Sequence, residues 1–376
     1  MENGGNDTML DHPDKRDSLY IVVPITVLYS VIFVTGFVGN IITCIVISRN
    51  KHMHTATNYY LFSLAVSDLL LLVTGLPPEM YSIWYKYPYV FGEVFCVLRG
   101  LAAETSANAT VLTITAFTVE RYLAICHPFL AHTMSKLSRA IKIIFSIWIV
   151  ALSFAVPQAA QFGVVEIPDQ EHTACLVKRM VFHYSFEVST FLFFLLPMTL
   201  ITVLYVLIGL RLRRTTLGKT TEPLGSQQDP GKGSRQQSSK RVLRMLVAVV
   251  VAFFICWAPF HAQRLVTIYV VPQFPHSLFT INLYTVITYL SGILYYVSTT
   301  VNPILYQIMS LKFREAFKML LGWRSTKDTT RHRWRRPDGR RWAVLRGGSG
   351  KGRDRQEVDV TDMTFMKTDS LRVAEG

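Results

Sequence analysis

The sequence predicts an all-α membrane protein, a seven-transmembrane helix bundle followed by a short amphipathic eighth helix. Half of the 376 residues are hydrophobic and only 17% are charged, whereas a soluble domain carries about 25% charged residues. The apolar residues gather in seven runs, each long enough to cross a bilayer as a helix, which takes about 20 residues. This composition argues against a disordered chain, a coiled coil and a nucleic-acid-binding module.

The seven predicted spans differ in how many charges they contain. The first has no charged residue, whereas the third has Arg99, Glu104, Glu120 and Arg121 near or inside it. Ionisable side chains are costly inside a bilayer, so those that occur there by default mark function. The spans cover approximately residues 20–47, 57–84, 95–126, 140–161, 184–210, 240–270 and 281–306.

The net charge of +14 is concentrated in two segments. Residues 211–244 contain nine basic and two acidic residues, residues 311–376 contain seventeen and nine, and the rest of the chain has a net charge of −1. Because basic loops favour the cytoplasmic side, where anionic lipids attract them, this pattern predicts an extracellular N-terminus and a cytoplasmic C-terminus. The segment before Tyr20 is unlike a cleavable signal peptide, so we expect the first span to be an uncleaved signal anchor.

We expect five parts along the chain. The stretch over 217–239 is rich in Gly, Ser, Gln, Thr and Pro, as in a flexible linker. Further on, apolar Phe313 and Phe317 stand among Lys312 and Arg314, as on an amphipathic helix at a membrane surface. The parts are an extracellular segment over 1–19, the seven-transmembrane domain over 20–310 with its cytoplasmic third loop over 211–239, the amphipathic helix over 311–321 and a disordered cytoplasmic tail over 322–376.

Two of the five cysteines, Cys96 and Cys175, fall on the predicted extracellular side. Disulfides form in that oxidising compartment, so we predict a bond that ties the start of the third span to the second outer loop. Asn6 opens an Asn-Asp-Thr motif in the outer segment and is a predicted glycosylation site. The remaining cysteines, which we expect to be buried thiols, are Cys44, Cys126 and Cys256.

Short motifs occur in order, one set in each predicted span. They are Gly39-Asn40, Leu64-Ala65-Val66-Ser67-Asp68, Glu120-Arg121-Tyr122, Trp148, Pro197 with Tyr205, Cys256-Trp257-Ala258-Pro259-Phe260 and Asn302-Pro303-Ile304-Leu305-Tyr306. Each motif is weak by itself, but the complete ordered set is specific. Over residues 20–321 the chain therefore resembles a rhodopsin-like, or class A, G-protein-coupled receptor.

Three further stretches narrow this resemblance. They run from Arg99 to Asn108, from Trp257 to Arg264 and from Ser291 to Tyr296. They are similar to the neuromedin U receptor branch, and most of all to its invertebrate CAPA (periviscerokinin) and pyrokinin receptors. The resemblance implies a plasma-membrane receptor for an amidated neuropeptide ending in Pro-Arg-X-amide, with CAPA-type peptides favoured and pyrokinin or neuromedin U peptides as the alternative.

The same resemblance implies the intracellular partners. It implies a Gq-type heterotrimeric G protein and calcium release. The Ser and Thr residues of the tail either are phosphorylated and recruit arrestin or only keep a linker solvated. Other classes have less support. A retinal protein needs a lysine in the last span, and residues 281–306 contain none. Neither the paired repeats of transporters nor an HExxH or GxSxG motif of an enzyme is visible in the spans.

The resemblance also assigns an activation switch and an ion site. Glu120 would hold Arg121 until the helices separate and Arg121 contacts the G protein, although a purely structural ion pair is the alternative. Asp68, in the middle of the second span, would join a polar network with Asn40, Ser298 and Asn302, or hold a sodium ion there. The switch residues are Glu120, Arg121, Tyr122, Trp257, Pro259, Asn302, Pro303, Tyr306, Tyr205, Pro197, Val111 and Phe253. The sodium ligands are Asp68, Thr110, Ser298 and Asn302, because a hard cation prefers oxygen.

Three charged residues are predicted to share one layer near the outer side. At 1.5 Å per residue, Glu79 lies about 16 Å outward of Asp68, and Glu104 about 12 Å below Cys96. Arg264 lies about 10 Å outward of Trp257. Two carboxylates and one guanidinium either pair among themselves or leave an excess acid for a cationic ligand.

We hypothesise that this layer binds the peptide ligand. Glu79 and Glu104 would hold the arginine of the peptide, since a guanidinium forks onto a carboxylate. Arg264 and His261 would border its C-terminal amide. The residues expected to line the apolar part of the site are Phe260, Tyr81, Tyr289 and Tyr296.

Overall fold

The computed structural model of the chain describes residues 17–129, 137–167, 172–179, 184–217, 230–273, 278–309, 313–315 and 317. The chain divides into one unit over Met1–Arg324, which contains all of these residues, and a second unit over Ser325–Gly376. The predicted glycosylation site Asn6, the middle of the third loop over 218–229 and the tail lie outside the described residues.

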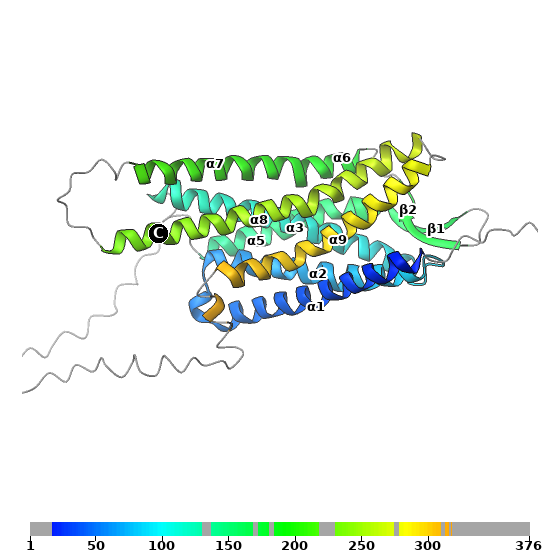
Figure 1. Cartoon of the computed structure of the whole chain (residues 1–376), viewed down its shortest axis with the longest axis horizontal. Coiled ribbons are helices and arrows are strands. Elements are labelled where there is room, and N and C mark those ends of the chain that lie inside the picture. The colour runs from blue at the N-terminus through cyan, green and yellow to red at the C-terminus, as the bar shows by residue number, and fades with distance from the viewer. Residues whose placement is uncertain are drawn as a thin grey trace, which may run out of the picture. The chain divides into compact units, whose positions relative to one another are not determined.

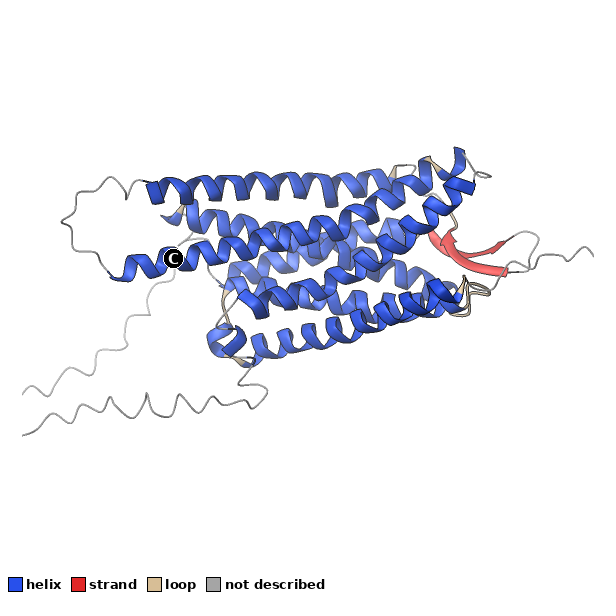
Figure 2. Cartoon of the chain, in the orientation of Figure 1, coloured by secondary structure: helices blue, strands red, loops and turns tan. Residues whose placement is uncertain are grey.

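The described part of the chain contains seven helical spans that are long and apolar enough to cross a membrane, which confirms the predicted all-α bundle. Successive spans run in alternating directions (Figure 1). Figure 2 shows one strand pair at one end of this helical body. The elements are α1 Leu19–Arg49, η1 Lys51–Met53, α2 Ala56–Trp84, α3 Gly92–Cys126, α5 Leu137–Ala159, β1 Phe162–Ile167, β2 His172–Val177, α6 Ser185–Thr190, the π-helical η2 Phe191–Leu195, α7 Leu196–Leu217, α8 Pro230–Tyr269, η3 Val271–Gln273 and α9 Leu278–Met309.

The helix ends differ from the predicted span ends mainly where the helix continues past its apolar run. The third span is predicted from residue 95, but α3 begins at Gly92, which has a φ of +80° that suits glycine. The sixth is predicted from residue 240, but α8 begins at Pro230, where the missing N–H of proline costs no helical bond. Of the predicted eighth helix, residues 313–315 and 317 are helical, and its other residues lie outside the described part.

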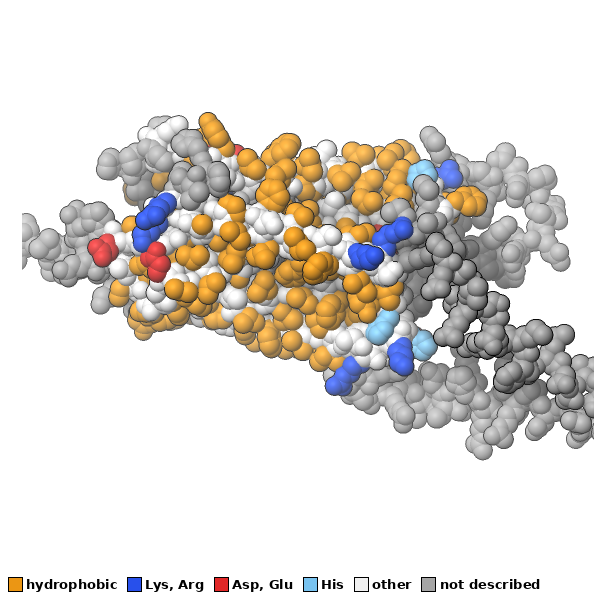
Figure 3. Space-filling view, turned by 180° about the vertical axis from the view of Figure 1, so that it is seen from behind, with side chains coloured by type: hydrophobic (Ala, Val, Ile, Leu, Met, Phe, Trp, Pro, Cys, Tyr) orange, Lys and Arg blue, Asp and Glu red, His pale blue; other side chains and the backbone are white. Residues whose placement is uncertain are grey.

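The outer surface of the bundle is apolar around its middle. On α1, Val22, Ile25 and Tyr29 are buried at helical spacing, while Val23 and Val27 between them are exposed. A helix that is apolar on both its buried and its exposed faces is typical of a membrane span. Figure 3 shows the same pattern on one face, where hydrophobic side chains cover the middle and charged side chains lie towards the two ends.

Close contact between α1 and α9 depends on a glycine near the middle of the bundle. A Cβ on Gly39 would stand 2.9 Å from the Cβ of Pro303, so only glycine allows this approach. The buried Asn40 amide donates to the Thr299 carbonyl at 2.9 Å. These contacts fix the position of α9, which carries several of the predicted site residues.

A β-hairpin packs over the start of α3, and its strands are an addition to the predicted fold. β1 and β2 pair antiparallel, with Val164 opposite Cys175. Cys175 is bonded to Cys96, which confirms the predicted disulfide. Glu93 binds the hairpin as well, because its carboxylate accepts from the Val164 N–H at 3.2 Å and pairs with Lys178 at 2.9 Å. We call this end of the bundle the hairpin end and the other the far end.

The three remaining cysteines are less uniform than predicted. Cys256 is buried, as expected, within the core around Trp257. Cys44 and Cys126 are partly exposed, and Cys126 is the last residue of α3.

Candidate functional site

A small cavity lies inside the bundle between α3, α6, η2 and α8. It contains four of the eight predicted ligand residues, which the fold brings together from two helices. The cavity is lined by Glu104, Ala107, Asn108, Ser189, Phe193, Trp257, Phe260, His261 and Arg264. Its lining combines aromatic rings with a few polar groups, as in many ligand sites.

Glu104 and Arg264 form a buried ion pair in this cavity. Both terminal nitrogens of the Arg264 guanidinium contact the Glu104 carboxylate, one on each oxygen. The guanidinium also lies over the Phe260 ring at 4.4 Å and the Phe186 ring at 5.3 Å. Aromatic faces attract a cation, so the pair is covered on two sides by favourable contacts. The two predicted residues are therefore bound to each other.

Glu79 pairs with Arg99, a residue that the predicted ligand layer did not include. The Tyr296 hydroxyl on α9 is a second polar group that acts on the Arg99 guanidinium. A Cβ on Gly75 would stand 2.8 Å from this hydroxyl, so the absence of a side chain at Gly75 leaves room for Tyr296. The excess of acid expected for this layer is thus balanced by a second guanidinium in the described part of the chain.

Aromatic rings in contact with one another connect the Glu104–Arg264 and Glu79–Arg99 ion pairs with Trp257. Phe260, which covers Arg264, stacks on Tyr295 with ring centroids 4.6 Å apart. Tyr295 in turn meets Trp257 edge-on at 5.1 Å and Tyr296 at 5.3 Å. A movement of either arginine would consequently disturb the packing around Trp257, since interiors are close-packed.

His261 is a buried member of the same group. Its ring stacks on Phe194 of η2 at 4.8 Å, and its Nδ1 lies 3.2 Å from the Thr190 hydroxyl. His261 thereby links α8 to the α6–η2 segment, and it borders the cavity beside Arg264.

The other two predicted tyrosines lie nearer the hairpin end. The Tyr289 hydroxyl donates to Asp17, which also pairs with Lys86 at 2.5 Å. Tyr81 packs edge-on against Phe91 at 5.2 Å. Asp17 and Lys86 were not predicted as site residues, because one precedes the first span and the other lies in a connection. In the sequence, only the opposite charges of Asp17 and Lys86 indicated that they could pair.

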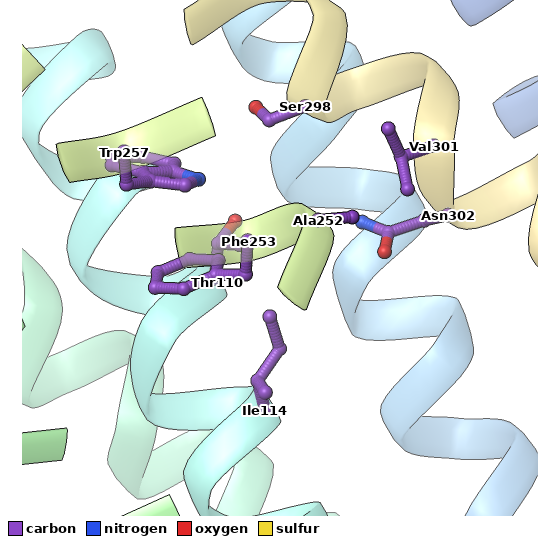
Figure 4. A pocket seen from close by; sticks show the side chains of 8 residues that line it. All are labelled: Thr110, Ile114, Ala252, Phe253, Trp257, Ser298, Val301 and Asn302. Atoms are coloured by element: carbon purple, nitrogen blue, oxygen red, sulfur yellow. The ribbon is translucent and has the colours of Figure 1, made fainter. Parts of the chain in front are cut away.

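A second cavity lies deeper, beneath Trp257 (Figure 4). Three of the four predicted sodium ligands, Thr110, Ser298 and Asn302, line it. The fourth, the buried Asp68, accepts from the Asn302 amide at 3.1 Å. Asn40 binds the backbone of α9 instead of joining this group. A carboxylate with hydroxyl and amide oxygens is a donor set that fits a hard cation such as sodium.

The predicted switch residues at the far end contact one another in part. Arg121 pairs with Glu120 at 2.5 Å and donates to the Thr57 hydroxyl at 2.7 Å. Tyr122 instead meets His127, with its hydroxyl 3.3 Å from the ring. Tyr205 packs against the core.

The remaining switch residues lie on α3, α7, α8 and α9. Phe253 stacks on Trp257 with centroids 5.3 Å apart, and Val111 is buried in the same core. Pro197 follows the π-helical turn η2, and Pro259 and Pro303 lie inside helices. Proline and π-turns are the usual places where helices bend. The side chain of Tyr306 lies outside the described residues.

Comparison with known proteins agrees with this architecture. A profile of the 7 transmembrane receptor (rhodopsin family) matches residues 39–306. The pyrokinin-1 receptor of Drosophila melanogaster is 53% identical over 81% of both chains. Neuromedin-U receptor 2 of Mus musculus is 39% identical over 81% of this chain and 76% of its own, and neuromedin-U receptor 1 of Homo sapiens is 40% identical over 80% and 74%. The chain belongs to the rhodopsin family of seven-transmembrane receptors.

Proposed function

We propose that the chain is a plasma-membrane receptor for an amidated neuropeptide that ends in Pro-Arg-X-amide. The observation that carries the proposal is the hairpin-end group of Glu79 and Glu104 with aromatic rings around them. Carboxylates of this kind recognise a guanidinium by two parallel hydrogen bonds. Relatives named for pyrokinin and for neuromedin U support a peptide ligand.

The comparisons favour a pyrokinin-type ligand over the CAPA-type ligand that the motifs favoured. The pyrokinin-1 receptor is more than half identical to this chain. Pyrokinins end in Pro-Arg-Leu-amide and CAPA peptides in Pro-Arg-Val-amide. This small difference between apolar side chains is worth about 1–3 kcal/mol, so we expect a graded preference for leucine.

In the proposed binding mode the arginine of the peptide meets the carboxylates Glu79 and Glu104. Arg264 and His261 border the neutral C-terminal amide, which needs hydrogen-bond donors and acceptors instead of an opposite charge. Rings of Phe260, Tyr296, Tyr289 and Tyr81 line the path between the amide and the hairpin end.

The proposal places the hairpin end outside the cell and the far end inside. The disulfide Cys96–Cys175 at the hairpin end supports this orientation, since disulfides persist in oxidising compartments. Peptide binding would favour the state in which Arg121 leaves Glu120 and contacts a Gq-type G protein, because a ligand shifts an equilibrium by its differential affinity. Arrestin would bind the phosphorylated tail, and Asp68 with its neighbours would hold sodium.

A calcium-release assay on cells that express the full chain tests the proposal. The panel contains peptides ending in Pro-Arg-Leu-amide and Pro-Arg-Val-amide, their free acids, and analogues with citrulline in place of arginine. We expect responses to both amides at lower concentrations for leucine, and large losses for the acids and the citrulline analogues. Silence to both amides at normal surface expression would remove the peptide assignment and leave the family membership intact.

A further inference from the structure

The two ion pairs of the hairpin end differ in how far solvent reaches them. The side chains of Glu104 and Arg264 are 5% and 13% exposed, whereas those of Glu79 and Arg99 are 37% and 21% exposed. Phe186 and Phe260 cover the Arg264 guanidinium. The Glu104 pair is thus enclosed by protein, and the Glu79 pair is open on one side.

This difference determines which carboxylate can exchange its cation. A partly exposed ion pair contributes little net free energy, because water replaces much of what is lost when the pair separates. Breaking an enclosed pair is costly, since one buried charge is left without a partner. An incoming guanidinium therefore exchanges more readily at Glu79 than at Glu104.

Arg99 has a second polar neighbour that remains available when Glu79 is taken. The Tyr296 hydroxyl acts on the Arg99 guanidinium, and Tyr296 is fixed by its edge-on contact with Tyr29 at 5.6 Å and by its place against Gly75. The Arg99 head group can therefore leave the carboxylate and still have a polar group beside it. This lowers the cost of the exchange.

We propose that Arg99 is an internal competitor at the peptide site, which holds the Glu79 carboxylate until the arginine of the peptide displaces it. The inference rests on the proposed function, because the competition requires a ligand that carries a guanidinium. It adds a residue that limits affinity and favours ligands able to offer two parallel hydrogen bonds, as arginine does and lysine does not.

The test compares full-length wild type with Arg99→Gln, Arg99→Lys and Arg179→Gln, at matched surface expression. Arg179 is an exposed arginine after β2, so its variant removes the same charge from the hairpin end without touching Glu79. Each receptor is titrated with the Pro-Arg-Leu-amide peptide and with its citrulline analogue. Arg99→Gln leaves no buried charge uncompensated, since Glu79 is partly exposed.

We expect Arg99→Gln to lower the half-maximal concentration of the arginine peptide by about three- to fivefold, the effect of removing one partly exposed ion pair. Arg99→Lys and Arg179→Gln should stay near wild type, and the citrulline peptide should gain nothing from Arg99→Gln. An unchanged or higher concentration for the arginine peptide, or an equal gain for the citrulline peptide, would overturn the competitor role while the wild-type response upholds the proposed function. A wild type that responds to neither amidated peptide would overturn both.

Discussion

At the scale of single residues, the hairpin end contains two carboxylates in unlike surroundings. Glu104 is buried and bound through both oxygens to Arg264, whose guanidinium lies over the rings of Phe186 and Phe260. Glu79 is the more exposed of the two and shares Arg99 with Tyr296. Glu104 is therefore expected to contribute more to the stability of the bundle, and Glu79 more to the exchange of cations.

The stability of the buried pair can be measured by removing its cation. Arg264→Gln should destabilise the receptor by about 3–5 kcal/mol, because the Glu104 carboxylate stays buried without a partner. Thermal unfolding of the detergent-purified receptor measures this loss. The double variant Arg264→Gln with Glu104→Gln should recover most of it, and Arg179→Gln is the control for removal of a surface charge. A single variant as stable as wild type would show that Glu104 has another partner.

At the scale of elements, the segment before α1 is joined to two other parts of the bundle. The Asp17 carboxylate accepts from Lys86, in the connection between α2 and α3, and from Tyr289 on α9. Burial acts to raise the pKa of Asp17, but the hydrogen bonds from Lys86 and Tyr289 together act more strongly, and this pKa lies below its ordinary value.

The lowered pKa of Asp17 predicts how this contact depends on pH. A carboxyl whose pKa is lowered on folding stabilises the fold at each pH above its unfolded pKa of about 3.9, and the stabilisation is lost as the pH falls through the folded value. Asp17→Asn should therefore lower the unfolding temperature by the same amount at about pH 5 and about pH 7.5. If the difference from wild type disappeared at the lower pH, the carboxylate would be protonating there and the assigned contacts would be wrong.

At the scale of the whole molecule, the sequence predicted the features that depend on local rules. The length of the apolar runs predicts the seven spans. The helical rise of 1.5 Å per residue predicts how deep in the membrane Glu79, Glu104 and Arg264 lie. The residues that a side chain contacts depend instead on which helix packs against the face of the helix that carries it. Arg99 and Glu104 are five residues apart, so they point about 140° apart on α3. Arg99 consequently meets α2 and α9 while Glu104 meets α8, and the sequence contains no comparable signal for these neighbours.

The hairpin illustrates the same limit. Val164, Val165 and Ile167 are β-branched and favour a strand, but a short apolar stretch in a loop also fits irregular structure. Its pairing partner β2 is held to α3 by the disulfide, and β1 itself is held by the bond from the Val164 N–H to Glu93. The disulfide itself was predictable because it required only the membrane side of each cysteine.

The far end offers a test of the switch that the resemblance implies. Glu120→Gln removes the charge that holds Arg121 at 2.5 Å, so it should raise calcium signalling in the absence of peptide by about two- to fivefold, since a partly exposed pair is worth at most about 1 kcal/mol. Thr57→Val, which removes the other Arg121 contact, should give a smaller rise. Basal signalling equal to wild type in Glu120→Gln, at the same surface expression, would favour a purely structural ion pair.

The central claim is that a carboxylate at the hairpin end binds the arginine of the peptide, and a charge exchange tests it most directly. Full-length wild type and Glu79→Lys, at equal surface expression, are titrated with the Pro-Arg-Leu-amide peptide and with the same peptide carrying glutamate in place of arginine. We predict that wild type responds to the arginine peptide alone, whereas Glu79→Lys loses that response and gains one to the glutamate peptide, whose carboxylate would meet the introduced lysine and Arg99. Unchanged potency of the arginine peptide on Glu79→Lys would contradict the claim.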